Sequence, residues 1–336
     1  GALMSMLSVV VPVFNTEWHY LEKCLSSFDD IDSDKFEIVV VDDGSELNYG
    51  TKLEKILVNH DYDITLVHKE NGGQNSARQS GLSASKYQYV LFLDSDDYID
   101  PHLLNKVLDC LDEHAPTILF YNYEVVDETG KVLESHFRWP EGYQDVDIKD
   151  GIIHSDSLCM AIYRKDCISA INYDINQQLR IGEDLAASMI ILLSANSASS
   201  LGVCLYKYVK RKTSISRNPP PGSTLDIQRA FELVLDTCEE QARLFRDELE
   251  WMAILHILGW GSLRALKKHG NSSEVKKCFF AWMDETFPSW RSNSYLSERK
   301  GLYGLWFRFA IAGHWGILSL GLNVRNGVKH LLEKTA

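Results

Sequence analysis

Residues 89–97 read Tyr-Val-Leu-Phe-Leu-Asp-Ser-Asp-Asp, an apolar run that ends in three carboxylates. Residues 36–45 repeat this arrangement as Phe-Glu-Ile-Val-Val-Val-Asp-Asp-Gly-Ser. Short apolar runs bounded by turn residues are typical of strands that are buried on both faces of a sheet. We therefore predict strands over Tyr89–Leu93 and Phe36–Val41, each followed by an acidic turn.

Further strands and helices alternate around these two. The Val-rich run Leu7–Val13 and the run Ile64–Val67 predict two more strands. The helices predicted between the four strands are Trp18–Phe28, Lys52–Val58 and Asn75–Ser85. This alternation indicates βαβ units, and so an α/β fold with an open, mostly parallel sheet and helices on both faces.

The remainder of the chain is less regular. Thr117–Val126 and Val203–Val209 are typical of strands, Lys131–Gln144 is a polar stretch, and Leu185–Ser194 predicts a helix. The sequence Arg-Asn-Pro-Pro-Pro-Gly-Ser at residues 217–223 is the strongest breaker, and helical periodicities follow it. We therefore predict one domain over residues 1–217 and a helical C-terminal extension over 218–336.

Composition narrows the class of protein. With 34 Lys and Arg against 47 Asp and Glu, the formal charge is −13, which argues against a partner bound through nucleic-acid phosphates. Seven scattered cysteines without a C-x-x-C pair predict thiols in a reducing compartment. The sequence shows neither a signal-peptide pattern nor an uninterrupted apolar run of membrane-spanning length. A cytoplasmic location is expected.

The C-terminal tail has a different balance. Residues 286–336 carry seven basic and two acidic side chains among Trp, Leu and Gly. Three interpretations stay open for the tail: packing on the chain's own helices, a homo-oligomer interface, or peripheral contact with an anionic membrane at its inner face. Packing and oligomerisation are the commoner roles of such a stretch.

The carboxylates at the strand ends are the candidate functional residues. Ligands of an open parallel sheet bind beyond the carboxyl ends of its strands, where Asp42-Asp43 and Asp94-Ser95-Asp96-Asp97 are expected. A single Asp at such a position is more often a turn former. Several carboxylates placed together repel one another, and this repulsion destabilises the fold unless a cation neutralises it. Oxygen ligands suit Mn2+ or Mg2+. Because both the dinucleotide-binding and the P-loop glycine patterns are missing, we expect a nucleotide diphosphate held through a divalent cation.

Four motifs occur together in order. They are Ser8-Val-Val-Val-Pro-Val-Phe-Asn15, Val39-Val-Val-Asp-Asp-Gly-Ser45, Asn71-Gly-Gly-Gln-Asn-Ser-Ala-Arg78 and Phe92-Leu-Asp-Ser-Asp-Asp97. Over residues 7 to 217 the chain thereby resembles the bacterial family 2 glycosyltransferases, inverting enzymes of GT-A fold that use nucleotide sugars. The resemblance implies hexosyl transfer from a nucleotide sugar, expected to be a UDP-sugar, to a glycan, glycoprotein or glycolipid hydroxyl.

The resemblance also implies roles for individual residues. Asp94 and Asp96 match the D-x-D pair, Asp96 as the direct metal ligand and Asp94 toward the ribose or the metal's waters, with Ser95 between them. Asp42 matches the carboxylate that binds uracil, and Arg78 the basic residue that faces the nucleotide. The other matching nucleotide-site positions are Pro12, Val13, Asn15, Glu17 and Asn71.

Glu183-Asp184 opens an apolar helix. Alone, such a pair reads as a partner of the helix dipole. Within the resemblance it matches the E-D motif, in which Asp184 is the general base and Glu183 binds the acceptor or supports the base. An acceptor hydroxyl needs such a base because it is a poor nucleophile until its proton is removed.

Residues 206–216, Tyr-Lys-Tyr-Val-Lys-Arg-Lys-Thr-Ser-Ile-Ser, resemble a lid segment of the family. Val209 stands where an Arg is usual, so Arg211 or Lys212 is expected to meet the diphosphate; a plain solvated turn is the alternative. Two rival functions are a sugar nucleotidyltransferase and a catalytically silent sugar- or nucleotide-binding module. The former would need a Gly-rich basic loop after Val13, and intact Asp94, Asp96 and Asp184 count against the latter.

Overall fold

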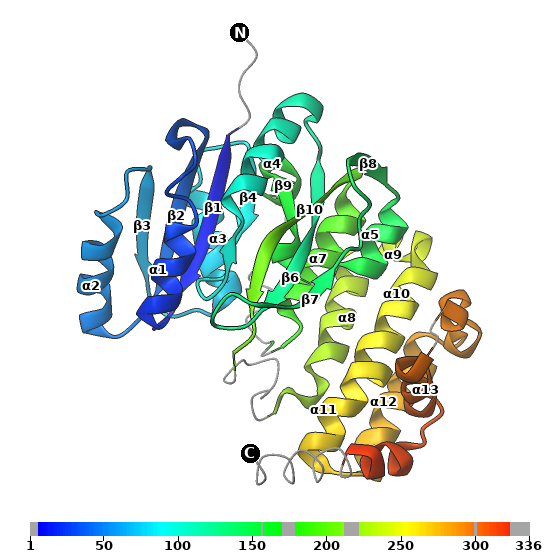
Figure 1. Cartoon of the computed structure of the whole chain (residues 1–336). Coiled ribbons are helices and arrows are strands. Elements are labelled where there is room, and N and C mark those ends of the chain that lie inside the picture. The colour runs from blue at the N-terminus through cyan, green and yellow to red at the C-terminus, as the bar shows by residue number, and fades with distance from the viewer. Residues whose placement is uncertain are drawn as a thin grey trace. The chain divides into compact units, whose positions relative to one another are not determined.

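A computed structural model describes residues 6–155, 157–169, 179, 181–211, 222–298 and 301–322 of the chain. The chain divides into two compact units. The first comprises Gly1–Leu179 with Glu183–Asn218, and the second comprises Arg180–Gly182 with Pro219–Ala336. The first unit contains the sheet and its helices, and the described part of the second is built from helices (Figure 1).

One ten-stranded sheet organises the first unit, in the order β3-β2-β1-β4-β9-β6-β10-β5, with β7 beside β6 and β8 beside β10. The strands are β1 (Leu7–Val13), β2 (Phe36–Asp43), β3 (Ile64–Lys69), β4 (Tyr89–Phe92), β5 (Tyr98–Ile99), β6 (Ile118–Val126), β7 (Val132–His136), β8 (Tyr143–Val146), β9 (Ala161–Arg164) and β10 (Ala198–Val209). Strands β3, β2, β1 and β4 are parallel, as are β6 and β10, and β9 runs antiparallel between these groups. The predicted α/β class is confirmed.

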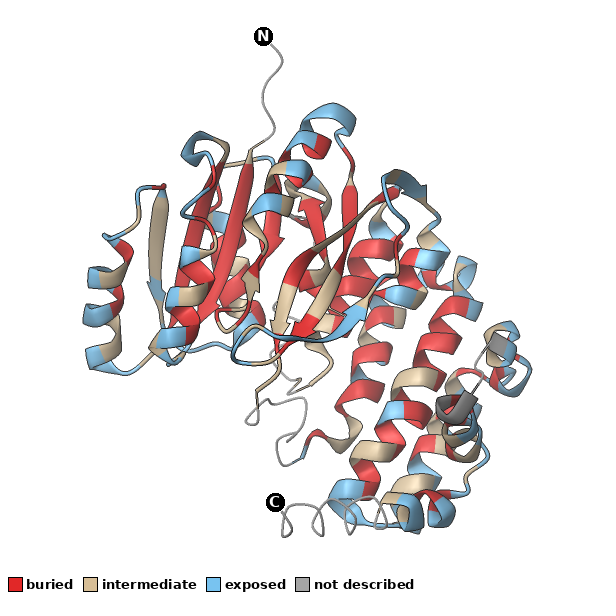
Figure 2. Cartoon of the chain, viewed as in Figure 1, coloured by how far each residue is buried: buried red, intermediate tan, exposed pale blue. Residues whose placement is uncertain are grey.

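The centre of this sheet is buried on both faces. Every residue of β1 and β2 is buried, and Figure 2 shows the burial continuing across the central strands. The buried carboxylate of Glu37 in β2 accepts hydrogen bonds from Ser8 Oγ in β1 at 2.7 Å and from the Lys86 backbone N–H at 2.6 Å. Both bonds end on Oε1, whereas Oε2 is buried without a hydrogen-bond partner among the described residues and has Lys86 Nζ at 3.4 Å. These contacts offset part of the cost of burying the charge.

Helices lie against both sides of the sheet (Figure 1). They are α1 (Trp18–Ser26), α2 (Leu47–Leu57), α3 (Gln74–Ala84), α4 (Pro101–His114), α5 (Ile148–His154), α6 (Lys165–Ser169) and α7 (Glu183–Ser194). Helix α3 packs closely on β1 and β2, because a Cβ atom on Gly81 would lie 2.3 Å from Val10 Cγ1. Only glycine fits that contact.

Several parts of the first unit differ from the sequence expectation: α5, α6 and β5 were not predicted, and α2 and β10 each begin five residues earlier than predicted. The polar stretch Lys131–Gln144 contains β7 and the start of β8. The side chains of β7 are largely exposed, so its sequence lacks the apolar pattern from which a strand is predicted. Helix α4 was not anticipated, although Asp100 caps it by accepting from the His102 and Leu103 backbone N–H groups. The short β9 was not anticipated either, and it closes the sheet between β4 and β6.

The second unit consists of packed helices. They are α8 (Asp226–Thr237), α9 (Glu239–Leu244), α10 (Arg246–Ala253), a π-helical turn at Ile254–Gly259, α11 (Trp260–His269), α12 (Ser273–Thr286) and α13 (Gly301–Ile311). The described part of the C-terminal tail packs within this unit, since Phe307 is buried against Trp251 and Trp315 against Phe279. Of the helices that the structure describes, none has both the length and the apolar content needed to cross a bilayer.

Candidate active site

The loops after β1, β2 and β4 are tied together at one edge of the sheet. The Asn15 backbone N–H donates to Ser45 Oγ at 2.9 Å, and Asn15 Oδ1 accepts from the Glu46 N–H at 3.0 Å. Thr16 Oγ1 and Ser95 Oγ are 2.6 Å apart. These bonds bring the predicted nucleotide-site loops together, as expected where parallel strands end side by side.

The two carboxylates at the end of β2 have different surroundings. Both lie within the strand, which runs two residues further than predicted because its pairing with β3 continues. Asp43 accepts from Lys69 Nζ at 2.6 Å and from the N–H groups of Gly72 and Gly73 at 3.0 and 2.8 Å. Asp42 accepts from the Ser45 N–H at 3.0 Å and lies 3.0 Å from His68 Nδ1. Asp43 therefore holds the glycine loop that begins α3.

The glycine loop is held further by Asn71. Its Nδ2 donates to the backbone carbonyl of Asp43 at 3.0 Å, so this side chain fixes the loop rather than projecting from it. Pro12 and Val13 end β1 and are buried, whereas Glu17 is exposed at the N-cap of α1. Of these three matched positions, only Glu17 presents its side chain to solvent.

Three acidic side chains converge after β4. One carboxylate oxygen from each of Asp94, Asp96 and Asp97 lies within 4.8 Å of the other two. Asp97 is committed to the fold, because it accepts from Tyr206 Oη at 2.6 Å and from the Val209 N–H at 2.7 Å. Asp94 and Asp96 remain as the more accessible members of the cluster.

Arg78 connects this cluster to the predicted base. Its side chain is fully buried, its Nη2 donates to Asp94 Oδ1 at 2.9 Å, and its Nη1 pairs with Asp184. Asn75 Oδ1 accepts from Nη1 at 3.2 Å. On the buried side of α3, its guanidinium reaches two carboxylates that need a counter-charge; that Arg78 also faces the nucleotide stays a prediction.

Glu183 and Asp184 form the first turn of α7. Burial raises the pKa of Asp184, with Arg78 acting in the opposite direction, and Ser157 Oγ donates to its other oxygen at 3.4 Å. Burial and the neighbouring Asp184 raise the pKa of Glu183 to about 7, and its Oε2 is buried without a hydrogen-bond partner among the described residues. Glu183 is therefore suited to holding or releasing a proton near neutral pH, and the raised pKa of Asp184 makes that carboxylate a better proton acceptor than an exposed Asp.

Arg211 lies at the other end of the acidic cluster. Its guanidinium pairs with Asp96 and lies 5.3 Å from the centre of the Tyr20 ring. Lys212 and the remainder of the predicted lid segment fall outside the described residues. The sequence offers no basic neighbour to the Asp94–Asp97 cluster, but the fold supplies Arg78 and Arg211 from distant segments.

The donor set fits a divalent cation. Burial and Asp94 raise the pKa of Asp96 to about 6, although Arg211 opposes that shift. The raised pKa shows that the nearby arginine does not fully compensate the clustered carboxylates. A hard divalent cation would supply the missing positive charge, and the carboxylate oxygens are suitable ligands for it. Asp96 and the Asp94 oxygen that Arg78 does not contact are the ligands that this arrangement leaves available.

Three side chains that contact the carboxylates of the candidate site were not predicted from the sequence. Gln74 Nε2 donates to Asp94 Oδ1 at 2.7 Å, and His68 and Ser157 contact Asp42 and Asp184 respectively. Gln74 lies within the Asn71–Arg78 motif, so its position was a usable signal. His68 and Ser157 carried none, because only the folded sheet brings them to the site.

Comparisons with known proteins agree with this geometry. The fold matches residues 1–349 of TarS from Staphylococcus aureus with a TM-score of 0.67 at 22% identity, over 96% of this chain and 92% of that one. The same fragment has been solved in complex with UDP-GlcNAc and with UDP. The GT-A fold predicted from the motifs is thereby confirmed.

Relatives in sequence are bacterial glycosyltransferases. The glycosyltransferase GlyA of Streptococcus pneumoniae is 30% identical over 63% of this chain and 31% of GlyA. The poly(ribitol-phosphate) beta-N-acetylglucosaminyltransferase TarS is 29% identical over 62% of this chain and 36% of TarS. The putative glycosyltransferase EpsH of Bacillus subtilis is 25% identical over 74% of both chains. The match thus spans about a third of GlyA and of TarS. Residues 8–171, about half of the chain, match the model of glycosyl transferase family 2.

Proposed function

We propose that this chain transfers a sugar from a UDP-sugar to an acceptor hydroxyl, with inversion at the anomeric carbon. The observation that carries the proposal is the buried Arg78, which links the D-x-D carboxylate of Asp94 to Asp184. A proton acceptor and the carboxylates of a donor site therefore belong to one cluster. TarS, whose fold this chain shares, binds UDP-GlcNAc and UDP, which supports a UDP-sugar as the donor.

Asp184 takes the acceptor proton in this proposal. Its raised pKa makes the carboxylate a stronger base than an exposed Asp. Arg78 fixes one of its oxygens, and the acceptor hydroxyl approaches the other, near Ser157. The oxygen of the acceptor hydroxyl then attacks the anomeric carbon as the bond from that carbon to the nucleotide diphosphate breaks, and the proton stays on Asp184.

Asp96 and Asp94 would hold Mn2+ or Mg2+. A bound divalent cation supplies charge neutralisation for the diphosphate leaving group. Arg211 pairs with Asp96 in this structure, and exchange of that partner for a nucleotide phosphate would place its charge on the donor. Asp42 and Asn15, with the neighbouring β1 loop, are the proposed nucleoside side of the site.

The acceptor is proposed by class. A hydroxyl of a glycan, glycoprotein or glycolipid is the proposed acceptor; the name of TarS gives poly(ribitol-phosphate), a different hydroxyl-bearing polymer, as the acceptor of that protein. Cytoplasmic placement, oligomerisation through the helical unit and peripheral membrane contact stay proposals of the same standing.

A donor panel tests the function. UDP release from UDP-GlcNAc and other UDP-sugars is measured with and without Mn2+, for the wild type and for Asp184→Asn. Metal-dependent release that the variant loses is the expected result. Release of pyrophosphate from UTP and a sugar phosphate would instead indicate a nucleotidyltransferase, and donor binding without turnover on any acceptor would indicate a binding module.

A further inference from the structure

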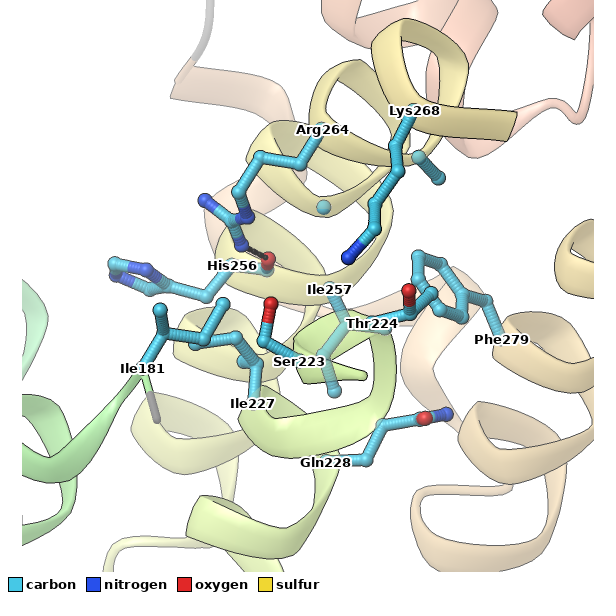
Figure 3. Close-up of a pocket in the computed structure, with 12 residues that line it drawn as sticks. Ile181, Ser223, Thr224, Ile227, Gln228, His256, Ile257, Arg264, Lys268 and Phe279 are labelled. Carbon is cyan, nitrogen blue, oxygen red and sulfur yellow. Dashed lines mark hydrogen bonds between the residues drawn. The ribbon is translucent and has the colours of Figure 1, made fainter. Parts of the chain in front are cut away.

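A pocket in the helical unit has no role in the chemistry above. It is lined by residues of α8, of α11, of the π-helical turn between α10 and α11, and by Ile181 (Figure 3). Its cavity volume is about 20 Å³. This space admits one water-sized atom, so a larger ligand would insert one of its atoms and rest at the mouth.

The polar side chains of the lining are donors rather than acids. Arg264 and Lys268 reach in from α11, and Ser223 and Thr224 from the 3-10 turn that precedes α8 (Figure 3). The described lining contains neither Asp nor Glu. Among the otherwise largely apolar residues of the described lining, the charged side chains are therefore both basic, which favours an anion over a cation.

Arg264 is the main charge of the wall. Its Nη2 donates to the backbone carbonyl of His256 at 2.9 Å, which is a neutral acceptor. Burial lowers the pKa of Arg264 to about 10, so the guanidinium stays protonated at neutral pH while it is poorly solvated. A desolvated cation held by a neutral partner gains more from a bound anion than an exposed one does.

Two further features favour an anion. Residues Ser223–Leu225 form a short 3-10 turn that runs directly into α8, and the residue before them is Gly222, which has no side chain to cap the helix start. The positive end of the α8 dipole lies at this turn, and the buried acid of the first helical turn, Asp226, pairs with Arg229 at 3.1 Å. Gln228, only 4% exposed, lines the same pocket, and its Nε2 is buried without a hydrogen-bond partner among the described residues.

We propose that this pocket binds an oxyanion, a phosphate or carboxylate group, between Arg264, Lys268 and the start of the α8 helix. One oxygen enters the cavity, and the other oxygens stay at the mouth near Lys268, which is exposed. This site goes beyond the proposed transfer reaction and does not depend on it.

Two adjacent lysines give a matched pair of variants for the test. Lys268 lines the pocket, whereas Lys267, the preceding residue of α11, is exposed and does not. Inorganic phosphate is titrated calorimetrically into the full chain at constant ionic strength without divalent cations. We expect saturable binding that Lys268→Met weakens by about tenfold, and that Lys267→Met changes by less than about twofold.

Arg264→Gln should remove the binding, with circular dichroism confirming that the variant is folded. Glycerol phosphate and acetate are titrated in parallel. Stronger binding of glycerol phosphate indicates a phosphate ester as the natural source, and equal binding of acetate indicates a carboxylate. The absence of saturable binding in the wild type, or equal losses in both lysine variants, overturns the proposal. UDP affinity with Mn2+ is measured on the same samples, so a failure of the donor site is seen separately.

Discussion

Arg78 and Asp184, 106 residues apart in the sequence, form an ion pair in which the guanidinium is fully buried. The same guanidinium holds Asp94 at 2.9 Å. Each carboxylate is partly accessible, with 24% of the Asp184 side chain and 26% of the Asp94 side chain exposed. The buried cation thus holds two acids that both present an edge to solvent.

Replacing Arg78 tests this arrangement. Arg78→Met leaves two partly buried carboxylates without their shared counter-charge, so we expect the free energy of unfolding to fall by roughly 3–5 kcal/mol at pH 7. Urea denaturation measures the change. Arg243→Met is the control, because Arg243 and its partner Glu239 are both highly exposed and such pairs contribute about 1 kcal/mol at most. Equal losses in the two variants would contradict the buried role of Arg78.

The two acids at the start of α7 should separate in function. Asp184→Asn should lower the transfer rate by roughly 10²-fold or more while UDP affinity stays near wild type, because the variant loses only the proton acceptor. Glu183→Gln keeps the Arg78 pair and should retain more activity. Steady-state rates and calorimetry on both variants decide the matter. If Glu183→Gln is the more damaging change, Glu183 is the base and Asp184 positions it.

Glu183 also predicts a pH dependence of stability. Its folded-state pKa of about 7 exceeds the usual value of 4.5 for Glu, so between these values the folded chain binds more protons than the unfolded chain. Its contribution is therefore most favourable below pH 4.5 and is lost as the pH rises toward 7. Glu183→Gln, which cannot ionise, should gain stability relative to wild type across that window. Unfolding free energies that stay parallel between pH 4.5 and 8 would contradict the shift.

The metal ligand is tested by a change whose effect depends on the cation. Asp96→Asn should weaken UDP binding in the presence of Mn2+ by roughly 100-fold or more, since even outer-shell changes at metal sites cost 10–100-fold. Without Mn2+ the same variant should bind UDP no more weakly than wild type, because it removes a negative charge and releases Arg211. Calorimetry under both conditions measures this, with the exposed Asp109→Asn as control. An equal loss with and without Mn2+ would make Asp96 a direct nucleotide contact.

The motifs predicted much of the site because their residues are close in sequence to the strand ends that position them. Asp94 and Asp96 follow β4 directly, and Asp184 opens α7 as expected. The surroundings of Arg78 were not predictable, since its motif places it beside Asn71 but its partner Asp184 lies on a distant helix. The strands β7 and β9 were missed for a related reason: one is exposed and the other is only four residues long, so neither has the burial pattern by which strands are recognised.

The C-terminal tail provides the last test, because its described residues divide into two sets. Trp315 is fully buried, donates from Nε1 to the Ala310 carbonyl at 3.3 Å and packs edge-on against Phe279 at 5.9 Å between ring centres. Ile317 and Leu320 are more than half exposed, whereas Arg325 and Lys329 fall outside the described residues.

Trp315→Ala should destabilise the helical unit by roughly 3–5 kcal/mol, the cost of emptying a large buried site, and thermal unfolding followed by circular dichroism measures it. Deleting residues 301–336 exposes Phe279 in the same way and should leave the protein insoluble or altered in oligomeric mass by light scattering. Leu320→Ala, on the exposed side, should leave stability within about 0.5 kcal/mol of wild type. If that variant instead loses self-association or sedimentation with anionic vesicles, the exposed side is a partner or membrane surface. A soluble truncation of unchanged mass would contradict the packing role, because the apolar residues that Trp315 covers would then have no need of it.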